Sequence, residues 1–321
     1  MSRARIAILG VLALALAGLV FVWSLLGSAT ITKDTSFTIP AGASVSSVAD
    51  KLEAEGLISS ASGFVLQARI FGSDAPIQAG EFLLTPDMSQ GDILAAFQSG
   101  DVIRRFVTVP EGMPSILVWE RLMAEELLTG EIDVPPEGSI LPDTYAFERG
   151  QSRKSLVEQM QAAMDRALAE EWAKRGPGIA VDTMRDALIL ASIVEKETGK
   201  PEERGMVAGL YSNRVRTGMK LQADPSIIYP ITKGKPLGRR IRQSEIAAVN
   251  GYNTYTRVGL PEGPITNPGR DSIAAVLNPE KTSALFMVAD GTGGHWFADT
   301  LEQHNANVAK WYAIRRERGE M

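Results

Sequence analysis

The sequence predicts an α+β fold with one N-terminal transmembrane helix, a small α+β subdomain and a larger mixed α/β domain. Three observations support this prediction. Residues 6–26 are uncharged and mostly apolar, a length that spans a bilayer as one helix. Strand-like and helical segments alternate along the rest of the chain. The roughly 290 residues after the apolar run are enough for two compact domains.

The charges around the apolar run predict its orientation. Arg3 and Arg5 precede it, and no basic residue follows before Lys33. The positive-inside rule therefore leaves the N-terminus in the cytoplasm and the remaining chain outside. A cleaved signal peptide is the alternative, with residues 27–29 as a small-residue cleavage site. We favour a retained anchor over residues 1–29, because apolar regions of signal peptides usually span only about 7–15 residues.

Composition excludes several functional classes. The chain has 33 Lys and Arg against 38 Asp and Glu, and no basic block stands out, which argues against a nucleic-acid partner. The absence of cysteine excludes disulfides, thiolate catalysis and cysteine-ligated zinc. The two histidines, His295 and His304, do not have the spacing of a helical zinc pair. We therefore expect no metal.

The predicted small subdomain covers residues 30–104. Residues 37–40 alternate like a strand, and Ser44 or Ser46 can cap a helix that Gly56 ends. A helix near residues 62–71, a strand at 79–84 and a helix between Ser89 and Gly100 follow. This order is that of a small α+β module.

The predicted larger domain covers residues 105–321. It starts with a strand at residues 106–109. Helices are expected at residues 116–128, 152–175 and 182–200, and the second of these carries one apolar stripe.

The helix at residues 182–200, capped by Asp182, is the most informative one. Between Ala187 and Val194 it is apolar on nearly every side, except at Ser192, so it is expected to be buried. The apolar run stops at residues 195–198, Glu-Lys-Glu-Thr, where the helix reaches a surface or a cleft. A carboxyl there is partly desolvated, which raises its pKa and suits a general acid.

Two glutamates compete for this role. On a helical wheel Glu197 stacks over bulkier apolar side chains than Glu195, which lies over Leu188 and Ala191. This slightly favours Glu197. The alternative is that both are solvated residues at a helix end, with Lys196 balancing the helix dipole.

Polar residues crowd into residues 213–269, after this helix. Tyr, Asn and Gln among Gly and Pro turns suit a groove that stacks on sugar rings and hydrogen-bonds hydroxyl and acetamido groups. Each of these residues can also be explained structurally, as part of a turn or as a buried side chain. The candidates are Asn213, Arg214, Gln222, Asp224, Tyr252, Asn253 and Tyr255.

Seven segments, in this order, resemble the endolytic murein transglycosylase family, also called MltG or YceG-like. They are SIVEKET, NRV, LQADPSIIY, GYNTYTRVGLP, GPITNPG, VADGTGGHWF and HNANV. The resemblance covers practically the whole chain and is strongest over residues 188–308. It implies an anchor in the bacterial inner membrane, a LysM-like subdomain at residues 30–104 and a periplasmic catalytic domain at residues 105–321.

The resemblance also implies the chemistry. Family members cleave the β-1,4 bond between N-acetylmuramic acid and N-acetylglucosamine within nascent glycan strands and leave 1,6-anhydro ends. The second glutamate of the EKET motif, here Glu197, is the family's catalytic residue, acting as acid and then as base. An intramolecular nucleophile needs only this one carboxyl, whereas ordinary glycoside hydrolysis uses two. No cofactor is implied, and the partners are glycan strands and, as further candidates, peptidoglycan synthases.

Supporting roles follow by inference from this chemistry. Gln222 and Asn253 are candidates for hydrogen bonds to the sugar, and Tyr252 and Tyr255 for its stacking walls. His295 is a candidate hydrogen-bond donor in the groove.

The sequence leaves two alternative roles for each of two charged residues. Asp224 either orients groups near the acid or caps the turn before Pro225, which we favour. Arg214 either pairs with Glu195 or meets the peptide stem.

A second function remains open at this point. The chain could be a non-catalytic glycan-binding scaffold of the elongation or division machinery, in which the LysM-like part binds and the glutamate helix is only core.

Overall fold

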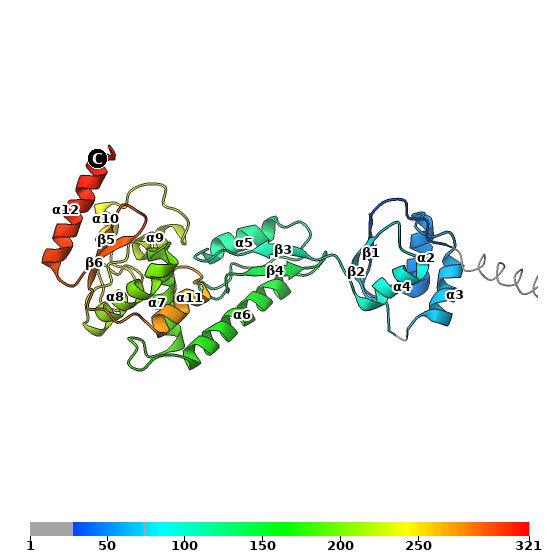
Figure 1. Ribbon diagram of the computed structural model, residues 1–321, viewed down its shortest axis with the longest axis horizontal. Helices are drawn as coiled ribbons and strands as arrows, with labels where there is room; N and C mark the ends of the chain where they lie inside the picture. Colours follow the sequence, from blue (N-terminus) through cyan, green and yellow to red (C-terminus); the bar gives the residue numbers. More distant parts are fainter. Residues whose placement is uncertain (1–27, 74, 321) are drawn as a thin grey trace, which may run out of the picture. The chain divides into compact units, whose positions relative to one another are not determined.

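The computed structural model describes residues 28–73 and 75–320, which form two compact units that meet between Arg105 and Phe106. The expected transmembrane segment at residues 6–26 lies outside this part of the chain. Among the described residues, no helix has the length and apolar character needed to cross a bilayer. The predicted fold class is therefore corrected to a mixed α/β fold (Figure 1), and the single-pass membrane location that rested on the helix is withdrawn.

The first unit combines an antiparallel strand pair with helices. Its elements are β1 (Thr35–Ile39), α2 (Val45–Ala54), α3 (Ala61–Phe71), β2 (Gly80–Leu84) and α4 (Gln90–Ser99). β1 pairs with β2, with Phe37 opposite Phe82. Both rings pack on Phe97 of α4, at centroid distances of 5.7 and 4.8 Å. These three aromatic residues, each at most 1% exposed, anchor the core of the unit.

Local signals set the helix ends in this unit. The side chain of Ser44 accepts from the backbone N–H of Ser47 and caps α2, which settles the choice between Ser44 and Ser46. Ser89 caps α4 in the same way. Gly100 ends α4 in the left-handed conformation, φ 73°, where a residue without a side chain is favoured.

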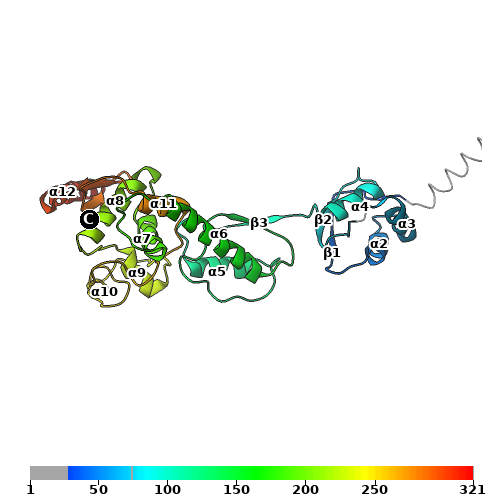
Figure 2. The ribbon, with the colours of Figure 1, turned by 90° about the horizontal axis from the view of Figure 1, so that it is seen from below.

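The second unit begins with a strand pair and two helices. These are β3 (Arg105–Thr108), α5 (Ser115–Ala124), β4 (Thr144–Phe147) and α6 (Arg153–Ala173), and β3 lies beside β4. Figure 2 shows α5 and α6 on the same side of β3. Helix α5 is shorter than predicted, because Glu125 is extended and its carboxylate accepts from the N–H of Leu127 at 3.2 Å.

The remainder of the second unit is organised around one helix, α7. In chain order the elements are α7 (Met184–Glu197), η1 (Pro201–Glu203), α8 (Arg204–Arg216), α9 (Pro225–Thr232), α10 (Gln243–Ile246), α11 (Arg270–Leu277), β5 (Phe286–Ala289), β6 (His295–Ala298) and α12 (Leu301–Glu317). Helix α7 packs against α6, α8, α9 and α11 (Figure 1). β5 and β6 form an antiparallel pair, and α12 packs on both strands.

Candidate active site

Helix α7 runs through the core, as its apolar sequence predicts. Every residue from Ala187 to Val194 except Leu188 is buried. The one polar side chain in this stretch, Ser192, is satisfied: its hydroxyl donates to the carbonyl of Ile189 at 2.7 Å and accepts from the N–H of Ile265 at 3.1 Å. Burial of a polar group is tolerated when it is hydrogen-bonded in this way.

The ends of α7 differ from the prediction. Thr183, not Asp182, caps the helix, since its side chain accepts from the N–H of Asp186. The helix ends at Glu197 and not at Lys200, because Thr198 is extended, with φ −136° and ψ 134°. Glu197 is therefore the last helical residue, where α7 leaves the core.

The carboxyl of Glu197 is buried. Burial, the larger cause, and the negative charge of Asp224 together raise its pKa to about 7. A hydrogen bond with the hydroxyl of Tyr211 and the positive charge of Arg214 oppose this rise. The sequence-based expectation of an elevated pKa at this helix end is met at Glu197. At neutral pH such a carboxyl populates both its protonated and its ionised form, as a residue acting as acid and then base requires.

Helix α8 supplies two buried neighbours of Glu197. Tyr211 is 2% exposed, and burial raises the pKa of its hydroxyl, so this group stays protonated and donates to Glu197. Arg214 is 7% exposed, and its guanidinium donates to the carbonyl of Leu285 at 2.7 Å and to that of Leu221. These bonds fix a positive charge beside Glu197. Arg214 thus acts near Glu197, and its hydrogen bonds do not involve Glu195.

Asp224 and Tyr255 form the other side of the cluster. The hydroxyl of Tyr255 donates to Oδ1 of Asp224 at 2.6 Å. Asp224 directly precedes α9, but its side chain makes no capping hydrogen bond. The capping role that the sequence favours for Asp224 is therefore wrong. Burial and the bond to Asp224 raise the pKa of Tyr255, which keeps it protonated as a donor. We call these five side chains the acid cluster: Glu197, Tyr211, Arg214, Asp224 and Tyr255.

Gln222 has a strained backbone next to the acid cluster. Its φ is 52°, a left-handed value that residues other than glycine seldom adopt. A hydrogen bond from its N–H to the carbonyl of Thr254, 3.2 Å, and one from the N–H of Ala223 to the Thr254 hydroxyl, 3.0 Å, hold this conformation. The side chain of Gln222 is exposed. Strain of this kind costs about 1–3 kcal/mol and is concentrated at functional sites.

Glu195 is engaged elsewhere. Its Oε2 accepts from the N–H of Gly269 at 3.0 Å and from the hydroxyl of Ser272 at 2.7 Å. Gly269 is the N-cap residue of α11, so the carboxylate satisfies donors at the start of that helix. Glu195 holds α11 against α7 and is not part of the acid cluster.

Two candidate asparagines have structural contacts. Asn213 donates to the carbonyls of Thr282 and Ala284 at 2.8 and 3.1 Å. Asn253 is fully buried, and its Nδ2 lies within hydrogen-bond distance of three carbonyls at 2.7–3.2 Å while its Oδ1 accepts from the N–H of Tyr255 at 2.9 Å. The sugar-binding role expected for Asn253 is therefore corrected. Its buried side chain orders the loop that presents Tyr255.

Tyr252 and His295 each contact a glutamate network outside the acid cluster. The ring of Tyr252 packs on Tyr229, with centroids 4.8 Å apart, and the two hydroxyls are hydrogen-bonded. Nδ1 of His295 pairs with Oε2 of Glu203 at 2.8 Å, and the backbone N–H of His295 donates to Oε1 of the same carboxylate at 2.9 Å. The pair fixes β6 to η1.

Sequence reasoning missed Tyr211 and one further carboxyl, Glu137. Glu137 accepts from the N–H of Ser115 at 2.9 Å and hydrogen-bonds with Tyr229. Burial raises its pKa to about 7. Its partners are distant in sequence, so no local pattern marks it. The sequence signal for Tyr211 is its place at the end of an apolar stretch of α8, two residues before Asn213.

Within residues 28–73 and 75–320, no three His, Asp or Glu side chains converge as metal ligands would. A pocket of about 500 Å³ opens at the same end of α7, with Lys196 and Pro225 among its lining residues. Lys196 and Pro225 are the chain neighbours of Glu197 and Asp224, while the five acid-cluster side chains themselves do not line this pocket.

A family model and curated relatives match this chain. The model of the YceG-like family matches residues 37–310. An endolytic murein transglycosylase of Streptococcus pneumoniae is 30% identical over 85% of this chain and 57% of its own length. The chain thus spans little more than half of that relative. An endolytic murein transglycosylase of Bacillus subtilis is 26% identical over 90% of this chain and 89% of its own.

A solved structure is also similar. It is the 2.6 Å crystal structure of a YceG-like protein from Listeria monocytogenes, with a TM-score of 0.52 and 28% identity. The match covers 85% of this chain and 99% of the other.

Proposed function

Because this chain belongs to the YceG-like family, we propose that it is an endolytic murein transglycosylase, a lyase that cleaves peptidoglycan glycan strands. The curated relatives carry this name. The observation that supports the chemistry most strongly is the carboxyl of Glu197, the last residue of a buried helix, whose pKa is raised to about 7.

In the proposed reaction Glu197 acts twice. Its protonated form donates to the glycosidic oxygen as the bond from the N-acetylmuramic acid anomeric carbon to that oxygen breaks. The C6 hydroxyl of the same sugar attacks the anomeric carbon, and the resulting Glu197 carboxylate accepts the hydroxyl proton. The bond formed closes a 1,6-anhydro ring, and the departing strand keeps the donated proton. One carboxyl near neutral pKa serves both steps.

The other members of the acid cluster tune this carboxyl. The charge of Asp224 favours the protonated form that donates. The hydrogen bond from Tyr211 and the charge of Arg214 favour the carboxylate that forms next. Tyr255 holds Asp224 in place through its 2.6 Å hydrogen bond. The opposing influences support a pKa close to the working pH.

The first unit is proposed to be the LysM-like part that binds glycan. Its order of elements, a strand, two helices and a strand antiparallel to the first, supports this assignment. Peptidoglycan synthases stay candidate partners through the family resemblance alone.

The test is digestion of purified peptidoglycan by the full chain and by Glu197→Gln. We expect the wild-type protein to release fragments with 1,6-anhydro ends, which are lighter by one water than hydrolysis products. Glu197→Gln, which cannot donate a carboxyl proton, is expected to lose at least about 100-fold in rate. Glu202→Gln, a change at an exposed residue, is the matched control.

Other outcomes assign other functions. Products with reducing ends would make the protein a hydrolase. Full activity of Glu197→Gln would move the acid to another residue. Tight binding of glycan without any cleavage would favour the non-catalytic scaffold.

A further inference from the structure

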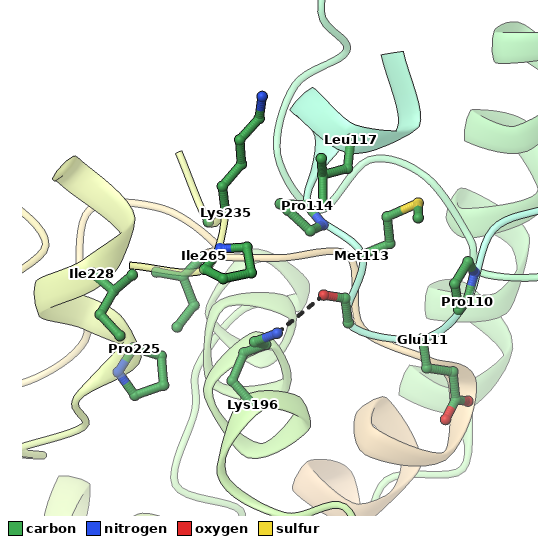
Figure 3. Close-up of a pocket in the computed structure, with 13 residues that line it drawn as sticks. Pro110, Glu111, Met113, Pro114, Leu117, Lys196, Pro225, Ile228, Lys235 and Ile265 are labelled. Carbon is green, nitrogen blue, oxygen red and sulfur yellow. Dashed lines mark hydrogen bonds between the residues drawn. The ribbon is translucent and has the colours of Figure 1, made fainter. Parts of the chain in front are cut away.

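The pocket that Lys196 and Pro225 line has mostly apolar walls. It has a volume of about 500 Å³ and is formed by the loop after β3, the start of α5, helix α9 and the segment before α11 (Figure 3). Its apolar side chains include Pro110, Met113, Pro114, Leu117, Ile228 and Ile265. Aliphatic walls of this kind suit small methyl-bearing groups.

Two lysines line the same pocket. Nζ of Lys196 donates to the carbonyl of Gly112 at 3.3 Å (Figure 3). Lys235 pairs with Glu120, and these two side chains are 39% and 43% exposed, so solvent screens the pair. An ammonium group has three N–H donors, so each lysine keeps donors for a ligand.

The acidic residue among those that line the pocket is already paired. Glu111 accepts from Nη2 of Arg204 at 3.1 Å. The lining residues thus comprise two lysines and one glutamate, a net positive charge, in a protein whose net charge is −5.

The pocket is adjacent to the acid in the chain itself. Lys196 precedes Glu197, and Pro225 follows Asp224. Consecutive Cα atoms lie about 3.8 Å apart, so the backbone at Glu197 and at Asp224 lies close to the pocket, although none of the five acid-cluster side chains lines it. N-acetylmuramic acid carries both the reacting anomeric carbon and, on its lactyl group, a peptide branch. A branch leaving a sugar bound at Glu197 therefore has this pocket within reach.

We propose that this pocket binds the peptide stem of the muramyl residue, so that the enzyme prefers peptide-bearing strands over peptide-free ones; this rests on the proposed function. Stem peptides combine alanine methyl groups with free carboxylates. The methyl groups match the apolar walls, and the carboxylates match the ammonium groups of Lys196 and Lys235. Removal of the stem frees one carboxylate on the lactyl group, but it takes away the alanine methyl groups and the carboxylates that lie further along the stem.

The test compares two glycan strands of equal length, one with its stems and one stripped of them by an amidase. For the wild-type protein we expect kcat/KM to be about tenfold higher on the peptide-bearing strand. In Lys235→Met the ratio of the two values is expected to fall about fivefold, the effect of one partly exposed charge contact. Lys281→Met removes the same charge from an exposed lysine outside the pocket and should keep the wild-type ratio.

A binding measurement keeps this inference separate from the proposed function. Calorimetry of muramyl tripeptide with wild-type protein and Lys235→Met needs no turnover, and we expect the variant to bind about fivefold more weakly. Equal cleavage of both strands by the wild-type protein would overturn the pocket assignment and leave the proposed activity standing. If neither strand is cleaved, the proposed function fails. In the calorimetry, equal binding of muramyl tripeptide by wild type and Lys235→Met would overturn the pocket assignment.

Discussion

The hydroxyl of Tyr255 donates to Oδ1 of Asp224 at 2.6 Å, and the charge of this Asp224 carboxylate acts on Glu197. The contact joins the start of α9 to the loop at residues 252–256. Its consequence is electrostatic: a fixed negative charge near the acid disfavours ionisation of Glu197 and raises its pKa. The acid is thus controlled by a residue that need not touch the reacting bond.

Replacement of Asp224 by Asn is expected to lower the pKa of Glu197, because a negative charge is removed. Fewer molecules then hold the catalytic proton at alkaline pH. The alkaline fall of kcat/KM should move to lower pH, with about a two- to fivefold loss of activity at pH 8 relative to pH 6. The measurement is the pH profile of anhydro-product release. Asp182→Asn, at an exposed residue before α7, is the control, and a profile of Asp224→Asn that matches it would contradict the account.

Glu195→Ala tests the structural role of that residue. The change leaves the N–H of Gly269 and the hydroxyl of Ser272 without their acceptor at the start of α11. We expect a loss of about 1–3 kcal/mol in the free energy of unfolding, measured by urea titration. The midpoint of the activity–pH profile should stay at the wild-type value. Loss of activity with unchanged stability would instead make Glu195 the acid.

The stability of the protein should depend on the protonation of Glu197. Its pKa is about 7 in the folded protein and near 4.5 in the unfolded chain, so the folded state holds the proton more tightly. The stabilisation is fully present below about pH 4.5 and is lost as pH rises through 7. Glu197→Gln removes this loss. At pH 8 it should therefore be more stable than wild type by about 1–3 kcal/mol, relative to the difference at pH 4.5.

Glu137, whose pKa is also raised by burial, titrates in the same range in both proteins. The comparison of wild type with Glu197→Gln cancels its contribution. Parallel curves of unfolding free energy against pH for the two proteins would contradict the assigned pKa of Glu197.

Gln222→Gly separates strain from function. Glycine adopts φ 52° without steric cost, so the variant is expected to match or exceed wild-type stability by up to about 1 kcal/mol. It also removes an exposed amide two residues before Asp224, and KM for glycan strands should rise several-fold. The measurements are urea titration and steady-state kinetics. A destabilised variant with unchanged KM would mean that Gln222 serves the fold alone.

Several elements could be predicted because their signals are local. The all-round apolar stretch of α7 gives its burial, and Ser89 and Gly100 give the ends of α4. The elevated pKa of Glu197 follows from the place where the apolar run stops. These features depend on residues within one or two helical turns of each other.

The remainder depends on contacts between distant segments. Asn253 and Tyr255 both suggest sugar binding in sequence, yet Asn253 is enclosed by the carbonyls of residues 245–248 while Tyr255 reaches Asp224. Burial raises the pKa of Glu137, and the hydrogen bonds that oppose this rise come from Ser115 and Tyr229, on opposite sides of it in sequence. The assignment of residues 6–26 to a membrane helix concerned a segment outside the described chain, and the described helices do not support the fold class built on it.

The most direct test of the account is the titration of the Glu197 side chain itself. Carbon-13 NMR of protein labelled at the glutamate carboxyl carbon, with Glu197→Gln used to identify the resonance, reports its ionisation. We expect a midpoint near pH 7, matching the alkaline limb of the activity profile. A midpoint near 4.5, the ordinary value of a solvated glutamate, would show that this carboxyl has no proton to give at neutral pH and would contradict its role as the acid.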